Sequence, residues 1–332
     1  MASRLRWQNN PAWCVAALVV TALLGGCSTA APVAVKPQPA PVPVAVKETA
    51  TPSPPAVVRP YPGPLVAGDE IIVAGRRFHT GTRIVTWQEP GGHNAYTGTA
   101  PPGPRSGGEK LRNDLGALQH LVDQFVLHYD GAGLSRVCFT VLQQRKLGVH
   151  LLLDLDGTIY QTMDLQDHAA HATIANDRSV GIEIANVGAF PPAEAKVFDE
   201  WYRKKRGGTV ITVPARFRNT GIRTPGFTGR PARPAAVRGT LAGKPLLQYD
   251  YTPEQYAALI KLTAALCRVF PRLRDDFPHD AQGRLITQQL PELEWKNYQG
   301  VLGHFHIQAN KIDPGPAFQW NTLIDGVRKE LK

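Results

Sequence analysis

The residues best suited to chemistry are concentrated near the carboxyl end of the chain, in residues 301–320, VLGHFHIQANKIDPGPAFQW. Here His304, His306, Lys311 and Asp313 fall within ten residues, and a Pro-Gly-Pro turn that fixes the backbone follows them. A neutral imidazole and a carboxylate are ligand types that zinc accepts, which makes His304 and Asp313 candidate ligands. A zinc site needs a third protein ligand, so another part of the chain must supply a further histidine.

One candidate for that histidine is His128, near the end of residues 125–131, whose apolar, β-rich composition predicts a buried strand. Functional groups of α/β sheets gather at the carboxyl ends of strands, which favours a role for His128 in a site. The alternative is a core histidine whose ring nitrogens are satisfied by hydrogen bonds. Two later histidines, His150 and His171, are predicted to line a cleft and to contact a substrate.

A single acidic residue, Glu183, interrupts the apolar run of residues 179–186. An unpaired carboxylate on a buried strand is costly, so Glu183 faces a cation, water or a polar cleft, or else it lies on an exposed edge strand. The pattern favours neither alternative. Asp154 and Asp156 are different, because they flank an Asp-Gly turn between two β-rich runs and turn chemistry accounts for both.

Helices and strands alternate along the chain, which predicts an α/β fold. A capping box, Thr252-Pro253-Glu254-Gln255, marks the start of one helix. Apolar periodicity predicts helices at residues 109–124, 134–144, 192–202, 256–270 and 318–331. β-rich runs predict a hairpin at the domain edge from residues 71–73 and 83–87, a buried strand at 125–131, a hairpin at 149–161 and a strand at 179–186.

The amino end has the features of an export signal. Arg4 and Arg6 precede an apolar run that is too short to span a bilayer, and Leu24-Gly25-Gly26-Cys27 follows it. This tetrapeptide resembles the lipobox of bacterial lipoproteins, so residues 1–26 are predicted to be a lipoprotein signal peptide and Cys27 an acylated membrane anchor. The alternative is a plain secretory signal with an incidental cysteine.

Residues 27–68 are predicted to hold the lipidated cysteine and a linker rich in proline and alanine, and residues 69–332 the folded domain. Such a linker favours polyproline II, at about 3.1 Å per residue, and so reaches on the order of 100 Å. Ser28 resembles the outer-membrane sorting pattern. The expected location is therefore the cell envelope, with the chain lipid-anchored in the outer membrane and facing the periplasm.

Residues 203–247 lack periodicity, hold eleven basic and no acidic residues, and are predicted to be an insertion. Without the two signal arginines the formal charge falls from +10 to +8, so the basicity is local to this segment. One alternative is a solvated, partly disordered loop, and the other is an element that binds anionic envelope polymer. Nucleic acid is not an expected partner outside the cytoplasm. Cys138 and Cys267 are predicted to be buried thiols rather than a disulfide.

Four motifs together resemble the zinc-dependent N-acetylmuramoyl-L-alanine amidases, which include the phage lysozyme-type amidases and the peptidoglycan recognition proteins. The resemblance covers roughly residues 120–330. The motifs are Phe125-Val126-Leu127-His128, Asp154-Leu155-Asp156-Gly157-Thr158-Ile159-Tyr160-Gln161, Ser179-Val180-Gly181-Ile182-Glu183, and Gly303-His304 followed by Lys311-Ile312-Asp313-Pro314-Gly315-Pro316.

This resemblance implies a single α/β domain with a central mixed β-sheet flanked by helices. It also implies one zinc ion per chain, bound by His128, His304 and Asp313, with a fourth position open to water. Glu183 would be the general base and Lys311 would stabilise the oxyanion, so peptidoglycan would be cut between N-acetylmuramic acid and L-alanine.

Two departures from the family pattern bear on the site. Gln308-Ala309-Asn310 makes the loop before Lys311 slightly short, and His306 is an additional histidine beside the ligand His304. We assign His306 to the surroundings of the site and, together with His150 and His171, to the candidate substrate contacts. The alternative functions are a peptidoglycan-binding module without catalysis and an envelope scaffold tethered by Cys27. The oligomeric state is left open.

Overall fold

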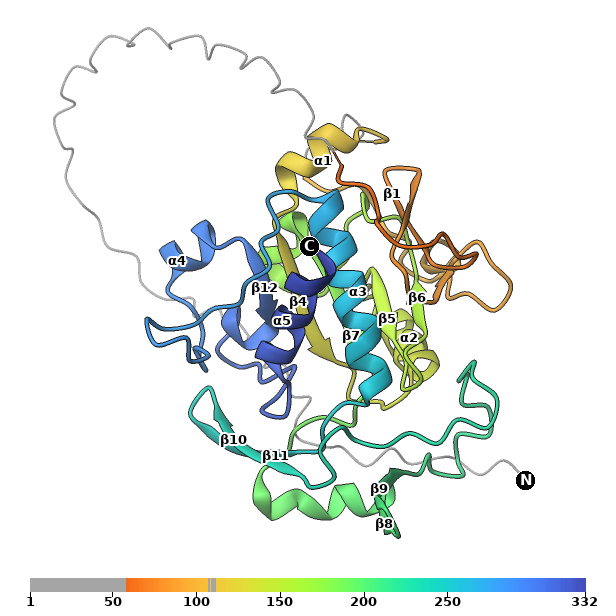
Figure 1. The fold of residues 1–332 in the computed structure, drawn as a ribbon, viewed down its shortest axis with the longest axis vertical. Helices are drawn as coiled ribbons and strands as arrows, with labels where there is room; N and C mark the ends of the chain where they lie inside the picture. Colours follow the sequence, from red (N-terminus) through yellow and green to blue (C-terminus); the bar gives the residue numbers. More distant parts are fainter. Residues whose placement is uncertain (1–57, 107, 109–111) are drawn as a thin grey trace, which may run out of the picture. The chain divides into compact units, whose positions relative to one another are not determined.

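The apolar runs become the strands of one central sheet in the computed structural model, which describes residues 58–106, 108 and 112–332 (Figure 1). The six strands are β3 (Ile84–Thr86), β4 (Gln124–Tyr129), β5 (Leu151–Leu153), β6 (Ile159–Gln161), β7 (Ser179–Ile184) and β12 (Gly300–Gly303). Their order is β12-β4-β7-β5-β6-β3, and only the β5–β6 pair is antiparallel. The predicted mixed sheet is therefore confirmed.

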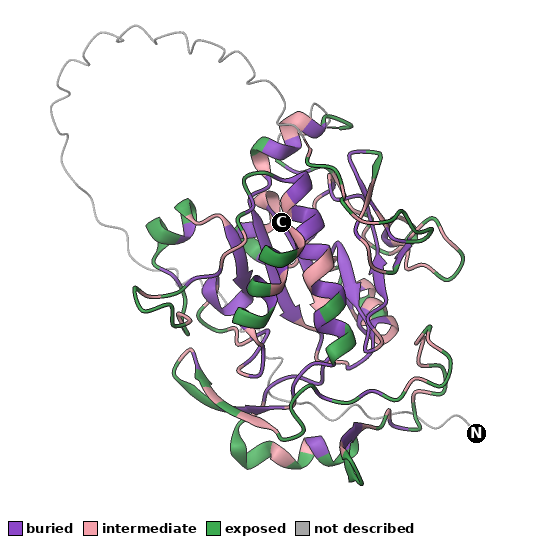
Figure 2. Cartoon of the chain, viewed as in Figure 1, coloured by how far each residue is buried: buried purple, intermediate pink, exposed green. Residues whose placement is uncertain are grey.

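Helices cover both faces of this sheet. On one face α3 (Pro253–Val269) packs against α5 (Trp320–Glu330), and their apolar side chains share a core with Phe125, Leu127 and Ile182 of the sheet. Burying one such side chain contributes about 1.5–3 kcal/mol. On the other face α2 (Ser135–Gln144) packs over β5 and β7. Figure 2 shows the buried residues gathered in the sheet and on the inner sides of these helices.

Sequence signals located most helix ends well. Thr252 caps α3, and the predicted capping box with Gln255 is present. The first predicted helix is shorter than expected, because α1 (Leu115–Leu121) begins only after Asp114, whose side chain accepts a hydrogen bond from the Ala117 N–H. The helix α4 (Glu292–Asn297) lies where irregular chain was expected. None of the helices in the described residues is long and apolar enough to cross a membrane.

The predicted hairpin between residues 71–73 and 83–87 is wrong. Instead β1 (Glu70–Val73) pairs with β2 (Arg76–His79) through a two-residue turn, in which Ala74 and Gly75 have positive φ angles of 50° and 72°. β3 joins the central sheet parallel to β6, and all three of its residues are buried. β3 is the last strand of this sheet, and the burial of its apolar side chains favours this position over an exposed hairpin.

The basic segment 203–247 is built from two hairpins rather than from a disordered loop. β8 (Tyr202–Lys205) pairs with β9 (Gly208–Ile211), and β10 (Val237–Leu241) pairs with β11 (Lys244–Gln248). The predicted helix before it is a 3-10 helix, η5 (Pro192–Glu200).

Outside the described residues lie the predicted signal peptide, Cys27 and most of the predicted linker. Cys138 is buried and Cys267 half-buried, and both are free thiols.

Candidate metal centre

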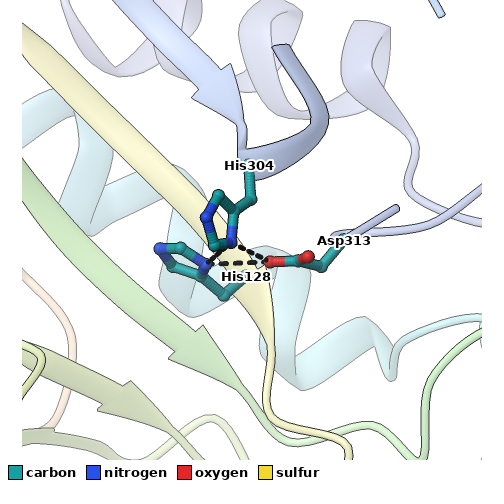
Figure 3. Close-up of side chains that lie close together, drawn as sticks. All are labelled: His128, His304 and Asp313. Atoms are coloured by element: carbon teal, nitrogen blue, oxygen red, sulfur yellow. Dashed lines mark hydrogen bonds and ion pairs between the residues drawn. The ribbon is translucent and has the colours of Figure 1, made fainter. Parts of the chain in front are cut away.

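Three segments bring His128, His304 and Asp313 together at the carboxyl end of the central sheet (Figure 3). His128 lies on β4, whose parallel neighbour β12 ends at Gly303. The 3-10 helix η6 (His304–His306) follows at once, so His304 begins beside the end of β4. Asp313 returns to the same point from the following loop, just before Pro314. The site is thus positioned by the pairing of two adjacent strands and by one turn.

The three side chains offer one ligand atom each, and these atoms are close together. Asp313 Oδ2 lies 2.8 Å from His128 Nδ1 and 3.0 Å from His304 Nδ1, and the two Nδ1 atoms are 3.0 Å apart. A tetrahedral zinc ion with bonds of about 2.0–2.2 Å separates its ligand atoms by about 3.3 Å. A slight outward movement of the three side chains therefore makes room for a metal ion.

Hydrogen bonds at the outer ring nitrogens set the tautomers of both histidines. His304 Nε2 donates to Gln308 Oε1 over 2.5 Å, which leaves Nδ1 without a proton. Ser179 donates its hydroxyl to the Ala175 carbonyl over 2.7 Å, so its oxygen accepts from His171 Nε2 at 3.2 Å. His171 Nδ1 is then an acceptor for His128 Nε2 at 3.1 Å.

Two Nδ1 lone pairs and one carboxylate oxygen consequently face the same point. All three residues are buried, with 2%, 5% and 8% of their surfaces exposed for His128, His304 and Asp313. Three acceptors facing one another in a buried place repel unless a cation lies between them. The donor set of two imidazoles and one carboxylate suits a divalent ion such as zinc.

The pKa values of the ligands agree with metal binding. Burial, followed by the neighbouring His304, lowers the pKa of His128 to about 4, so its imidazole is neutral at neutral pH as a ligand must be. Burial alone would raise the pKa of Asp313, but the neighbouring imidazoles of His304 and His128 hold that pKa below its usual range. His128 is therefore a neutral imidazole and Asp313 an ionised carboxylate.

Glu183 lies beside His128 on the adjacent strand. β7 runs between β4 and β5, so the edge-strand alternative for Glu183 is wrong. The two residues are register partners in a parallel pair, and their side chains leave the same face of the sheet. Glu183 Oε2 is buried and makes no hydrogen bond to any described residue. Burial, and then the charges of Asp313 and Asp130, raise the pKa of Glu183 well above its usual value.

Lys311, two residues before Asp313, acts on both groups through its charge, which lowers the pKa of Glu183 and of His128. The loop that ends in Asp313 places it there, and the side chain is half-exposed. A carboxylate with a free oxygen, an ammonium group and a metal-ligand set thus meet at one end of the sheet. This combination can activate water and stabilise a developing negative charge.

Two of the predicted substrate contacts are core histidines instead. His150 is fully buried, its Nδ1 accepts from the Gly181 N–H, and its Nε2 lies 3.0 Å from the Asp167 carbonyl. His306 is also fully buried, and it bonds the Gly303 N–H through Nδ1 and the Ile286 carbonyl through Nε2. Neither has a ring nitrogen left for a metal or a substrate.

The third predicted substrate contact, His171, has both ring nitrogens in hydrogen bonds, to His128 and to Ser179. Sequence reasoning did not assign this role, nor the roles of Ser179 and Gln308. Each of these contacts is a hydrogen bond through space, and the histidine pair is separated by 43 residues. The shortened loop at 308–310 was the available signal for Gln308.

Residues 118–210 match the family model of N-acetylmuramoyl-L-alanine amidases. The matched range contains His128 and Glu183, and His304 and Asp313 lie beyond it. No curated protein matches the sequence of this chain. The resemblance to the amidase family found in the sequence is therefore confirmed over this range.

Several solved structures match this chain at low sequence identity. The endolysin amidase LysCS from Clostridium intestinale is 14% identical, with 74% of this chain and 95% of that one covered and a TM-score of 0.37. AmiD from E. coli, solved with an anhydro-muropeptide substrate, is 18% identical, with 62% and 57% covered and a TM-score of 0.33. Drosophila peptidoglycan recognition protein SD is 15% identical, with 71% and 90% covered and a TM-score of 0.32.

Replacing a ligand should abolish metal binding. We expect His304→Ala to lose stoichiometric divalent metal, measured by mass spectrometry of the purified protein, because two ligands do not hold the ion. His79→Ala is the control, since His79 lies on β2 and is bonded to Asp69. A full complement of metal in His304→Ala would contradict the assignment of His304 as a ligand.

Removing the hydrogen-bond partner of His128 should weaken metal binding without removing a ligand. We expect His171→Ala to lower the affinity about 10–100-fold in competition with a chelator. Gly181→Ala tests the same contact with the imidazole kept, because a Cβ there would lie 2.5 Å from His171 Nδ1. Unchanged affinity in both variants would show that His171 does not support His128.

Proposed function

We propose that this chain is a zinc-dependent N-acetylmuramoyl-L-alanine amidase, which hydrolyses the amide bond between the lactyl group of N-acetylmuramic acid and L-alanine in peptidoglycan. The observation that carries the proposal is the convergence of His128, His304 and Asp313 beside Glu183. The match of residues 118–210 to the amidase family supports the choice of reaction.

Each residue of the site has a defined task in this reaction. His128, His304 and Asp313 would hold the zinc ion, which would lower the pKa of a bound water toward about 7 and polarise the substrate carbonyl. Glu183 Oε2, which has no other hydrogen-bond partner among the described residues, takes a proton from the attacking water. Lys311 offsets the negative charge that develops on the carbonyl oxygen. His171 and Gln308 keep His128 and His304 oriented.

Proton and bond changes then balance within the site. The water oxygen adds to the carbonyl carbon, and Glu183 returns its proton to the nitrogen as the carbon–nitrogen bond breaks. The products are a lactyl carboxylate and a free amino group on L-alanine. The raised pKa of Glu183 favours this exchange, because such a carboxyl binds a proton readily and then releases it to the amine.

Glu183→Gln should separate catalysis from binding. We expect the variant to keep its zinc and its fold but to lose about 10²- to 10⁴-fold in rate, the usual contribution of a general base. The measurement is mass spectrometry of stem peptides released from purified sacculi, which carry a new amino-terminal alanine. Glu194→Gln, an exposed acid on η5, is the matched control.

Two results would contradict the proposal. Turnover close to wild type in Glu183→Gln would remove Glu183 from the mechanism. Zinc-loaded wild-type protein that binds sacculi without releasing peptides would favour the alternative of a peptidoglycan-binding module.

We also propose that Cys27, which lies outside the described residues, is acylated and anchors the domain in the outer membrane, facing the periplasm. The support is the sequence Leu24-Gly25-Gly26-Cys27 after an apolar run, together with Ser28. We expect cells that express the wild-type chain to incorporate labelled fatty acid into it, and the Cys27→Ala chain to incorporate none. Equal labelling of both chains would show that the cysteine is incidental.

A further inference from the structure

The β8–β9 hairpin carries the densest positive charge among the described residues. Tyr202 begins β8 in the protein interior, and the next four residues, Arg203, Lys204, Lys205 and Arg206, are all exposed. Because successive side chains of a strand point to opposite sides, both sides of the hairpin are cationic. Figure 1 places it at the lower edge of the domain, apart from the central sheet.

A fifth cation lies at the same tip. Arg230 donates from Nη1 to the Gly207 carbonyl over 3.0 Å, which brings its guanidinium to the hairpin turn. Within the described part of the chain, no carboxylate forms an ion pair with any of these five side chains; Glu200, the acid that precedes them, pairs with Arg216. We call these five residues, Arg203, Lys204, Lys205, Arg206 and Arg230, the cationic tip.

The base of the hairpin is fixed to the domain. The Tyr202 ring stacks on Tyr249 with centroids 3.9 Å apart, and the Thr209 hydroxyl donates to the Pro234 carbonyl. The Ile211 N–H donates to the Gly229 carbonyl over 2.8 Å. The charges are therefore presented by an ordered element, so their mutual repulsion is not relieved by movement of a loose loop.

The basic segment is attached to the same end of the sheet as the candidate metal centre. Arg233 donates to the Ala317 carbonyl, and Gln248, the residue that follows the segment, donates to the Pro314 carbonyl over 3.0 Å. Both acceptors belong to the loop that follows Asp313. The basic segment therefore contacts the loop that carries Asp313, at the metal-centre end of the sheet.

The surface chemistry favours carboxylates of a polymer over a bilayer. The exposed large hydrophobic residues of the described chain are Leu65, Val66, Ile174 and Leu293, and none of them lies on the basic segment. A surface that inserts into lipid presents apolar or aromatic side chains beside its cations. The cationic tip has only charge to offer.

We propose that the cationic tip is a second docking surface, separate from the metal centre, for the carboxylates of peptidoglycan stem peptides. The identity of the polymer rests on the proposed function. Several weak contacts with one polymer would raise the local concentration of scissile bonds at the metal centre, without contributing to the chemistry. Each contact is exposed and is screened by salt within about 10 Å at 0.1 M.

The test compares two variants that lose the same charge. One changes the four residues Arg203, Lys204, Lys205 and Arg206 to Gln. The control changes four exposed cations elsewhere, Arg76, Lys146, Arg274 and Lys329, to Gln. Thermal unfolding checks that both fold. Binding to sacculi is measured by co-sedimentation of metal-free protein, at low and high salt.

We expect the first variant to bind sacculi about tenfold or more weakly at low salt and to show a flatter salt dependence. The control should bind like the wild type. When the carboxylates of the sacculi are converted to amides, the wild type should bind them as weakly as the first variant does.

Three outcomes would overturn the proposal. The first is equal loss in both variants, which would indicate net charge alone. The second is wild-type binding that survives amidation. The third is binding to phosphatidylglycerol vesicles that exceeds binding to sacculi and depends on the four residues, which would assign the surface to a membrane. Cleavage of a soluble muropeptide by the wild type tests the proposed function. Binding to sacculi is measured without metal and therefore does not depend on that result.

Discussion

The parallel pairing of β4 with β7 and β12 is the constraint on which the candidate site depends. It places Glu183 opposite His128 and brings the start of η6 to the end of β4. A slip of one residue in this register would turn His128 toward α3 and α5. Phe125 and Leu127 oppose such a slip, because both are fully buried in the core that these helices form with the sheet. The packing of Phe125 and Leu127 on one face of the sheet thus fixes the position of His128 on the other face.

The arrangement of the three candidate ligands is locally unfavourable, and the surrounding structure maintains it. Three acceptor atoms face one another in a buried place, which is unfavourable without a cation. The hydrogen bonds at the outer nitrogens of His128 and His304 prevent the simplest relief, which is to turn a protonated nitrogen inward. Close packing helps, since a side chain on Gly181 would displace His171. The same rigidity prepares the site for a metal, because little reorganisation remains when the ion binds.

Local signals in the sequence predicted those parts of the fold that local physics determines. The capping box at Thr252, the Asp-Gly hairpin at Gly157 and the β4 strand all follow from turn chemistry or from apolar runs. The two hairpins of the basic segment were missed, because contacts distant in sequence stabilise them, such as the stacking of Tyr202 on Tyr249. Short strands of this kind have no periodicity of their own to detect.

The candidate site, like the fold, could be predicted from the sequence only where the signal was local. The types and spacing of His304 and Asp313 were readable, whereas the choice of His128 as their partner came from the family resemblance. His306 differs from His304 only through its neighbours, since the Gly303 N–H and the Ile286 carbonyl occupy both of its ring nitrogens. His150 is occupied in the same way. A sequence lists the histidines but does not show which nitrogens remain free.

The basic segment both supports the loop after Asp313 and carries surface charge, and a deletion would change both at once. Its second hairpin supports the loop after Asp313, because Gln248 bonds the Pro314 carbonyl and a Cβ on Gly239 would lie 2.5 Å from the Pro316 Cβ. The Tyr251 hydroxyl, just beyond the segment, donates to the same Pro314 carbonyl over 2.6 Å. Removing the segment would therefore disturb a candidate ligand as well as the surface charge. Substituting the exposed cations at the tip of the first hairpin changes the charge alone, because their side chains lie outside the packed core and the backbone pairing of β8 with β9 remains.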